Sequence, residues 1–268
     1  GAGLRGPKGL RATVYATDIK KISALATDAQ GRIWAATAAA TDKDTDAIFL
    51  IADADATPLE VATDVHTPLG LLWVGDSLFV SEANSVEVFS GFDGTTFATR
   101  TTLVSFADGT GELNGIAQGA DGRIYLGISA PCNACTPTQP YSASVVSFLA
   151  DGTDLQVVAR DIRAAVGLAF YPGTNDLFVT MNQRDDLGSK TPGDWLAVVQ
   201  NGQSWGFPGC YGQGGSKCIG VPEPTAVLGE HAAVAGVAIV TGQLGPSVGT
   251  GAVVAEWVTG TVKLVRLT

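Results

Sequence analysis

The densest group of side chains able to do chemistry lies between residues 183 and 194. Asp185 and Asp186 are adjacent, and Asp194 follows after a break that contains Gly188 and Pro192-Gly193. Neighbouring carboxylates repel each other, so a loop that gathers them gains from binding a cation. Calcium accepts several oxygen ligands, carboxylate and backbone carbonyl alike. We therefore expect these three aspartates to be ligands of a calcium ion.

The two histidines both precede strand-like segments. His231 lies in GEHAAVAG and His66 lies in DVHTPLG. An imidazole titrates near neutral pH and is a frequent general base or metal ligand. We predict His231 as the catalytic base, with an exposed loop histidine as the alternative. If His66 lies at the same site, the two histidines would share a metal with Glu112 or Asp185.

The four cysteines form two local pairs, Cys132/Cys135 in PCNACTP and Cys210/Cys218 in GCYGQGGSKC. Local pairs in loops rich in glycine and proline are typical of disulfides in secreted or periplasmic proteins. A four-cysteine zinc site is the alternative, because CNAC has ligand-like spacing. The wider second pair makes a poor zinc knuckle. We expect two disulfides and a secreted or periplasmic location.

A two-strand motif with a glycine-containing turn recurs along the chain. Its copies begin near residues 22, 68, 113, 165 and 235. The first four are spaced about 45 to 52 residues apart, close to the ~40–50 residues of a propeller blade. The last gap, about 70 residues, fits two blades, with Gly202–Pro208 opening the second. We predict an all-β, six-bladed β-propeller of four-stranded antiparallel blades, with five blades as the alternative.

Each blade of a propeller packs its inner strand against those of its neighbours. Four copies of the motif place a glycine at the same position, which suits such crowding: Gly70, Gly115, Gly167 and Gly236. A ring must also close, or it exposes a strand edge. We expect residues 12–16 to pair with residues 262–267 for this purpose. In that arrangement His231 would face the mouth of the central channel.

Composition limits the class of protein. The chain has 268 residues, 46% of them hydrophobic, and the repeats run through it without a linker, so we expect one domain spanning 1–268. A net charge of −10 argues against nucleic acid and against anionic membranes as partners. No apolar run reaches the ~18–20 residues that a membrane-spanning helix needs.

The segment Ile162–Gly212 carries an ordered series of motifs: GLAF, PGTNDLFVT, NQRDDLG, PGDWL and GQSWGFPGCYG. Upstream, NGIAQGADGRIYLGISAPCNAC adds a strand pair followed by a cysteine loop. In these motifs the chain resembles the glucose/sorbosone dehydrogenase family, and the resemblance covers most of its length. Members of that family are secreted six-bladed propellers that use pyrroloquinoline quinone (PQQ) and calcium to oxidise sugars or aldehydes.

The resemblance implies a site at one mouth of the channel, where a sugar or aldehyde, the quinone and calcium meet. It implies that the backbone carbonyls of Gln183 and Arg184 hold calcium beside the cofactor. It also implies a set of cofactor contacts: Arg163, Gln183, Arg184, Asn114, Trp257 and Lys263. Two positions depart from the family. Leu113 stands where the family has its catalytic histidine, and Ala164 stands where it has an asparagine.

Three functions remain open at this point. The first is a quinone- and calcium-dependent sugar or aldehyde dehydrogenase, in which His231 would replace the missing base. The second is a secreted propeller that binds a small ligand or a partner without redox turnover, which Leu113 and Ala164 favour. The third is a metal-dependent lactonase, for which Glu112, Asn114 and Asp185 would supply the ligands.

Overall fold

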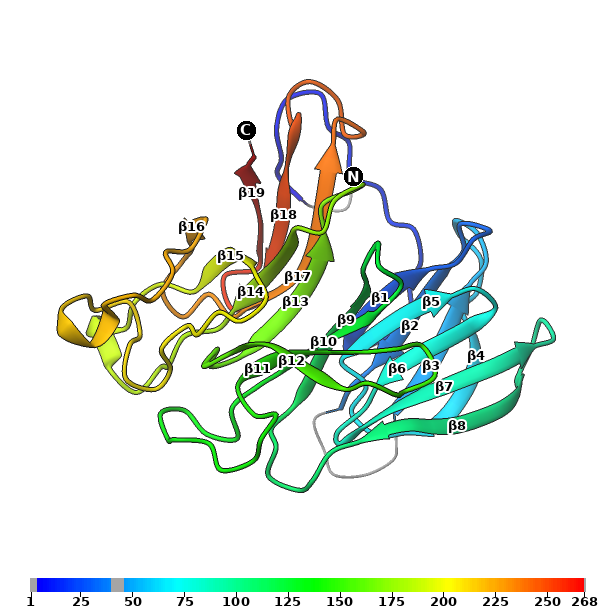
Figure 1. Ribbon diagram of the computed structural model, residues 1–268. Helices are drawn as coiled ribbons and strands as arrows, with labels where there is room; N and C mark the ends of the chain where they lie inside the picture. The colour runs from blue at the N-terminus through cyan, green and yellow to red at the C-terminus, as the bar shows by residue number, and fades with distance from the viewer. Residues whose placement is uncertain (1–3, 40–45, 268) are drawn as a thin grey trace.

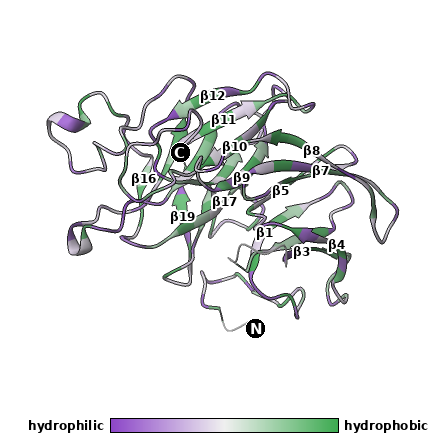
Figure 2. Cartoon of the chain, turned by 90° about the horizontal axis from the view of Figure 1, so that it is seen from below, coloured by the Kyte–Doolittle hydropathy of each residue, from purple (hydrophilic) through white to green (hydrophobic). Residues whose placement is uncertain are grey.

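The computed structural model describes residues 4–39 and 46–267, which form five antiparallel sheets. Figure 1 shows the sheets following one another in chain order, from the blue N-terminal blade to the red C-terminal one. Seen from below in Figure 2, they are arranged around a common centre. The protein is thus an all-β propeller.

The first blade contains β1 (Ile22–Thr27), β2 (Ile33–Thr37), β3 (Asp46–Ile51) and β4 (Leu59–Val65). The second contains β5 (Gly70–Val74), β6 (Ser77–Ser81), β7 (Ser85–Phe92) and β8 (Phe97–Ser105). The third contains β9 (Leu113–Gln118), β10 (Ile124–Ile128), β11 (Ser144–Phe148) and β12 (Gln156–Arg160).

The fourth blade contains β13 (Ala165–Phe170), β14 (Leu177–Met181), β15 (Trp195–Val199) and the short β16 (Ala226–Val227). The fifth has three strands, β17 (Val234–Thr241), β18 (Thr250–Glu256) and β19 (Thr261–Arg266). Two 3₁₀ turns, η1 (Gly188–Lys190) and η2 (Ser216–Cys218), lie in loops of the fourth blade. Nowhere in the described ranges is there a helix with the length and apolar character to cross a membrane.

The prediction of six blades is wrong, and the alternative of five is correct. Gly202–Pro208 does not open a hidden blade. Its backbone instead lies along the outer edge of the third blade, where Arg160 N donates to Gln203 O and Trp205 N donates to Arg160 O (3.0 Å each). Ser204 and Arg160 form a parallel bridge. The glycine- and proline-rich residues that follow form a disulfide-tied loop, because they lack the alternating apolar pattern of strands.

The apolar core consists of clusters between neighbouring sheets. One gathers Trp34, Ile48, Leu71 and Phe89 between the first two blades. Another places Leu113 among Val86, Phe106 and Ile128, between the second and third blades. Each blade therefore buries its alternating apolar side chains against the next blade rather than in one central core.

The recurrent glycines do lie at contacts between inner strands. A Cβ on Gly70 would come within 2.5 Å of Asn114 O in β9, and one on Gly115 within 2.6 Å of Val166 O in β13. Gly167 approaches Ala235 O of β17 in the same way. Only glycine allows inner strands this close. Gly236 differs, because a Cβ there would have nothing within 4 Å.

The predicted ring closure does not form. β19 pairs with β18, and Tyr15 O accepts a hydrogen bond from Asp55 N (2.9 Å) instead of pairing with residues 262–267. Contacts join β1 to β5, β5 to β9, β9 to β13 and β13 to β17, with no comparable contact between β17 and β1 in the described residues. Large apolar side chains are exposed on the first and fifth blades: Ile22, Leu25, Trp257, Val258 and Val262.

Candidate functional site

A cavity of about 630 Å³ opens where the inner strands β5, β9 and β13 begin. We call it the mouth cavity. Its polar lining comes from loops of the second, third and fourth blades: His66, Asn84, Asp108, Glu112, Asn133 and Arg163. This mixture of amide, carboxylate, imidazole and guanidinium groups can both donate and accept hydrogen bonds. Such a cavity suits a small polar ligand.

Arg163 is held in the mouth cavity by the loop that the Cys132–Cys135 disulfide closes. Its Nη2 donates to Asn133 Oδ1 (2.9 Å) and its Nη1 donates to Asn182 O (3.3 Å). Asn133 Nδ2 in turn donates to Asp185 Oδ1 (2.7 Å). The guanidinium is thus bonded to neutral acceptors, and no carboxylate in the described part of the chain forms an ion pair with it. Its positive charge remains available to a ligand.

The carboxylate of Asp186 is paired with the guanidinium of Arg184. Arg184 Nε and Nη2 contact Asp186 Oδ1 and Oδ2 at 2.7 and 2.6 Å, and the guanidinium also lies 4.9 Å from the centre of the Tyr211 ring. The hydrogen bonds from Arg184 hold the pKa of Asp186 below its usual value. Arg184 and Asp186, both predicted as site residues, therefore neutralise each other's charge.

Asp194 is buried and organises the backbone. Its Oδ1 accepts a hydrogen bond from Gln183 N (2.8 Å) and its Oδ2 accepts one from Val234 N (3.2 Å). Burial raises its pKa, although these backbone donors act in the opposite direction. The side chain of Gln183 is also engaged, because its Nε2 donates to Tyr211 O (3.0 Å). Asp194 thus connects the fourth blade to the start of β17.

The structure does not bring the three aspartates together. Asp185 contacts Asn133, Asp186 contacts Arg184, and Asp194 contacts backbone amides. Across residues 4–39 and 46–267, no three His, Cys, Asp or Glu side chains are placed to hold a metal ion. Calcium ligands at this loop would have to be mainly the backbone carbonyls of Gln183 and Arg184. The same finding leaves the four-cysteine zinc site and the lactonase metal site without a ligand cluster.

The histidine that lines the mouth cavity is His66. His231 is exposed, lies outside the lining of that cavity, and has its Nε2 3.4 Å from Gly188 O. The structure therefore does not place the two histidines in one metal site. The backbone of His231 has a φ of +48°, so the loop before β17 turns in the left-handed region at this residue.

Leu113 is fully buried in the apolar cluster under the mouth cavity. The neighbouring Asn114 is buried as well, and its Nδ2 donates to Glu112 O (3.0 Å) and Ser129 Oγ (2.9 Å). Asn114 therefore supports the loop rather than lining the cavity. Ala164, which stands where the family has an asparagine, is buried and offers no polar side-chain atom.

Trp257 and Lys263, the predicted cofactor contacts of the fifth blade, lie apart from the mouth cavity. Trp257 is 80% exposed. Lys263 Nζ forms an ion pair with Glu256 Oε1 (2.8 Å). Of the residues named from sequence for cofactor binding, Arg163 alone lines this cavity.

The sequence analysis did not single out several lining residues, among them Asn84, Asp108 and Asn133. Asn133 had a usable signal, because it is a polar residue enclosed by a short disulfide loop beside a strand end. Asn84 and Asp108 had none, since their loops carry no motif beyond ordinary turn residues.

The two disulfides predicted from sequence are formed, Cys132–Cys135 and Cys210–Cys218, and the described residues contain no free cysteine. Such bonds are typical of proteins from an oxidising compartment.

The fold is similar to the propeller fold of soluble aldose and glucose dehydrogenases, among them a PQQ-bound one, at low sequence identity. Three solved structures illustrate the likeness. The PQQ-bound aldose sugar dehydrogenase from Streptomyces coelicolor superposes with a TM-score of 0.76 at 17% identity, covering 96% of this chain and 80% of that one. The apo aldose sugar dehydrogenase from Escherichia coli gives 0.62 at 15%, covering 94% and 87%.

A calcium structure of a Trichoderma reesei carbohydrate-active enzyme of family AA12 gives a TM-score of 0.67 at 14% identity, covering 91% of this chain and 75% of that one. No family model and no curated protein sequence matches the chain. The comparisons therefore establish the fold, and the chemistry depends on the residues of the site.

Proposed function

We propose that this protein binds a sugar or small aldehyde in the mouth cavity and that it is a base-lacking relative of the quinone-dependent sugar dehydrogenases. The observation that carries the proposal is the burial of Leu113 in an apolar cluster at the position of the family's catalytic histidine. A leucine cannot accept the hydroxyl proton whose removal accompanies hydride transfer.

The residues present do not fit a working quinone site. PQQ carries several carboxylates, whereas Arg163 is the one Arg or Lys among the described residues that line the mouth cavity. Asp108 and Glu112 add negative charge to the same lining. Ala164 offers no polar contact, and Lys263 is paired with Glu256 outside the cavity. We therefore derive no reaction step through the quinone.

The same lining suits a neutral polyhydroxylated ligand. Carboxylates such as Glu112 accept hydrogen bonds from hydroxyl groups, whereas Arg163 and the amide of Asn84 donate them. Glu112 is exposed at the rim, and Arg163 is half-buried behind it. A sugar or a hydrated aldehyde can be bonded from both sides without any net charge of its own.

The rival function is the quinone- and calcium-dependent dehydrogenase itself. Its support is the ordered series of family motifs and the likeness to PQQ-bound and calcium-containing structures. In that case calcium would be held by the backbone carbonyls of Gln183 and Arg184, and the base would have to be a residue other than Leu113.

Two measurements separate these functions. Calorimetric titration with a panel of aldoses and small aldehydes, in the absence of any cofactor, should show binding that Arg163→Ala and Glu112→Ala each weaken. Arg160→Ala serves as a matched arginine control away from the cavity. Dye reduction should stay at background when calcium, PQQ and the same sugars are added. Absence of binding to every compound in the panel overturns the proposal, and quinone-dependent dye reduction supports the rival.

A further inference from the structure

The loop between β10 and β11 passes the mouth cavity with little support from its own backbone. Ala130 N donates to Arg163 O (2.6 Å), but residues 131–138 form no backbone–backbone hydrogen bond with the described part of the chain. Within this stretch the Cys132–Cys135 disulfide closes a short ring, and Cys135 N donates to Cys132 Sγ (3.0 Å). The conformation of these residues therefore depends on the disulfide and on side-chain contacts.

Asn133 lies inside this ring and makes those side-chain contacts. Its Oδ1 accepts hydrogen bonds from Arg163 Nη2 (2.9 Å) and Asp185 N (3.2 Å), and its backbone O accepts one from Arg163 Nε (3.4 Å). Its Nδ2 donates to Asp185 Oδ1 (2.7 Å). An ionised carboxylate only accepts hydrogen bonds, so Asp185 fixes the amide of Asn133 with its nitrogen toward the carboxylate and its oxygen toward Arg163.

The guanidinium of Arg163 is oriented by neutral oxygen atoms. Asn133 accepts from two of its nitrogens, and Asn182 O accepts from the third, Nη1 (3.3 Å). Without the side chain of Asn133, the guanidinium would keep only the two longer bonds, of 3.3 and 3.4 Å. The amide of Asn133 thus sets the direction of the guanidinium and leaves its positive charge for a ligand.

We propose that Asn133 is the positioning residue of Arg163 and that Asp185 and the Cys132–Cys135 disulfide hold it in place, so that opening this disulfide lowers the affinity of the mouth cavity for its ligand. Arg163 contacts the ligand, and Asn133 acts on binding through Arg163. The statement about affinity rests on the proposed function. The statement about the orientation of Arg163 does not, and it is tested without any ligand.

The ligand-free measurement is the exchange with water of the side-chain N–H protons of Arg163, followed by ¹⁵N-correlated NMR. Hydrogen bonds slow such exchange. Arg163→Lys identifies the signal. Arg123 Nε, which donates to Ser147 Oγ (3.0 Å) in the third blade, is the internal control. Asn133→Ala removes a hydrogen bond to a charged group, so we expect it to speed the exchange of Arg163 roughly tenfold and to leave Arg123 unchanged.

Exchanging the side chains at positions 133 and 185 separates positioning from general support of the loop. In the double variant Asn133→Asp/Asp185→Asn, the amide at position 185 can donate to the carboxylate at position 133, which still accepts from Arg163. We expect the Arg163 protons of this variant to exchange as slowly as those of the wild type. Asp185→Ala removes the group that orients the amide and should speed exchange by a smaller factor than Asn133→Ala.

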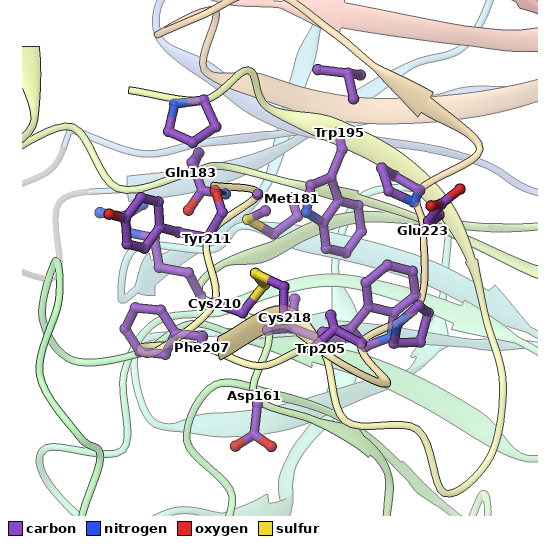
Figure 3. Close-up of a pocket in the computed structure, with 18 of the residues that line it drawn as sticks. Asp161, Met181, Gln183, Trp195, Trp205, Phe207, Cys210, Tyr211, Cys218 and Glu223 are labelled. Atoms are coloured by element: carbon purple, nitrogen blue, oxygen red, sulfur yellow. Dashed lines mark hydrogen bonds between the residues drawn. A yellow bond between two sulfur atoms is a disulfide. The ribbon is translucent and has the colours of Figure 1, made fainter. Parts of the chain in front are cut away.

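The Cys132–Cys135 disulfide is tested in a variant in which it is the remaining disulfide. Cys210→Ser/Cys218→Ser removes the other bond, which Figure 3 shows between Phe207 and Trp205 in the lining of a second cavity. Dithiothreitol then reduces Cys132–Cys135 to two thiols and is itself oxidised to a cyclic disulfide. Alkylation and mass spectrometry verify the reduction, on which we expect Arg163 to exchange faster. Cys132→Ser/Cys135→Ser gives the same comparison without a reductant.

D-Glucose is the probe for affinity, in calorimetric titrations of the same samples. Asn133→Ala and opening of the disulfide should each weaken its binding about three- to tenfold, the value of one hydrogen bond. Cys210→Ser/Cys218→Ser, before reduction, should bind it as the wild type does.

The inference is overturned if Asn133→Ala or opening of the Cys132–Cys135 disulfide leaves the exchange of Arg163 unchanged. It is also overturned if the double variant at positions 133 and 185 exchanges as fast as Asn133→Ala, or if Arg163 is released while the affinity for glucose stays the same. If the wild-type protein does not bind glucose, that result bears on the proposed function, and the exchange of Arg163 decides this inference by itself.

Discussion

The inner strands of the fourth and fifth blades, β13 and β17, carry the same glycine motif but differ in what lies beside them. Gly115 of β9 is pressed against Val166 O of β13, and Gly167 of β13 is pressed against Ala235 O of β17. Thr180 Oγ1 also donates to Ala235 O (2.6 Å). At β17, Gly236 occupies the equivalent position with open space beside it. A glycine at this position therefore permits close approach of a neighbouring inner strand. Whether such a strand lies there depends on the arrangement of the other blades.

The hydrogen bonds by which buried Asp194 joins the fourth blade to the start of β17 should be the most costly to remove. Asp194→Ala leaves the amides of Gln183 and Val234 unpaired in a buried setting, at about 1–3 kcal/mol each, so we expect a loss of about 2–6 kcal/mol in the free energy of unfolding. Urea denaturation measures it. Asp185→Ala, on the exposed side of the same loop, is the control and should cost under about 1 kcal/mol. Equal losses in the two variants would contradict the role given to Asp194.

Gly115 and Gly236, which occupy the same motif position in β9 and β17, test this comparison directly. Gly115→Ala forces a Cβ to within 2.6 Å of Val166 O, so we expect a loss of about 1–3 kcal/mol. Gly236→Ala meets no atom and should be neutral, or stabilising by up to about 1 kcal/mol through the lower entropy of the unfolded chain. Thermal and urea unfolding of both variants provide the measurement. A large loss in Gly236→Ala would mean that β17 is covered in solution.

A smaller effect is expected from the hydroxyl that joins the fourth and fifth blades. Thr180→Val keeps the shape but removes the donor to Ala235 O and the acceptor of Gly167 N, at a cost of about 1–2 kcal/mol. Thr180→Ser retains both hydrogen bonds and should lose about half of that or less. The comparison is made at one pH by denaturant titration. If the serine variant is the less stable of the two, the methyl group rather than the hydroxyl matters.

The smallest effect concerns pH and the fifth blade. Burial acts to raise the pKa of Glu256, but hydrogen bonds from Lys263, Thr259 and Thr261 outweigh it and lower the pKa below its usual 4.5. A carboxyl whose pKa is lowered in the folded state contributes stability above 4.5, and this contribution disappears as the pH falls through the folded value.

Glu256→Gln should therefore be less stable than the wild type at pH 7 by about 1 kcal/mol, and the difference should shrink as the pH drops below 4.5. Asp194 has the opposite sign, because its raised pKa favours the folded state at pH values below its usual 3.8. Unfolding followed from pH 7 to pH 3 measures both. A difference for Glu256→Gln that is independent of pH would exclude the ion pair with Lys263 as its source.

The sequence predicted the repeating blades, the two disulfides and the crowded glycines because each rests on local chemistry: turn residues, cysteine spacing and strand periodicity. The blade count was overestimated because a long interval between repeats cannot be told from an extra blade. Residues 202–208 showed that such an interval can instead pair with a neighbouring edge.

The site was predicted less well, because the directions of side chains depend on contacts far apart in sequence. Asp185, Asp186 and Asp194 looked like one cluster, but Arg184, Asn133 and two backbone amides bind them separately. The disulfide loop marked Asn133 as a residue to consider, but its contact with Arg163, thirty positions away in sequence, is visible only in the structure.

The series of contacts from β1 to β17, with no comparable contact back from β17 to β1 in the described residues, has a thermodynamic consequence. In a chain of units that touch only their neighbours, stability is a sum of unit terms and nearest-neighbour terms, as in a one-dimensional array. Each end unit has one coupling where an inner unit has two. Partial opening should then start at the two ends and spread inward, leaving the third blade, with Leu113 beneath the mouth cavity, as the last part to exchange its amide protons.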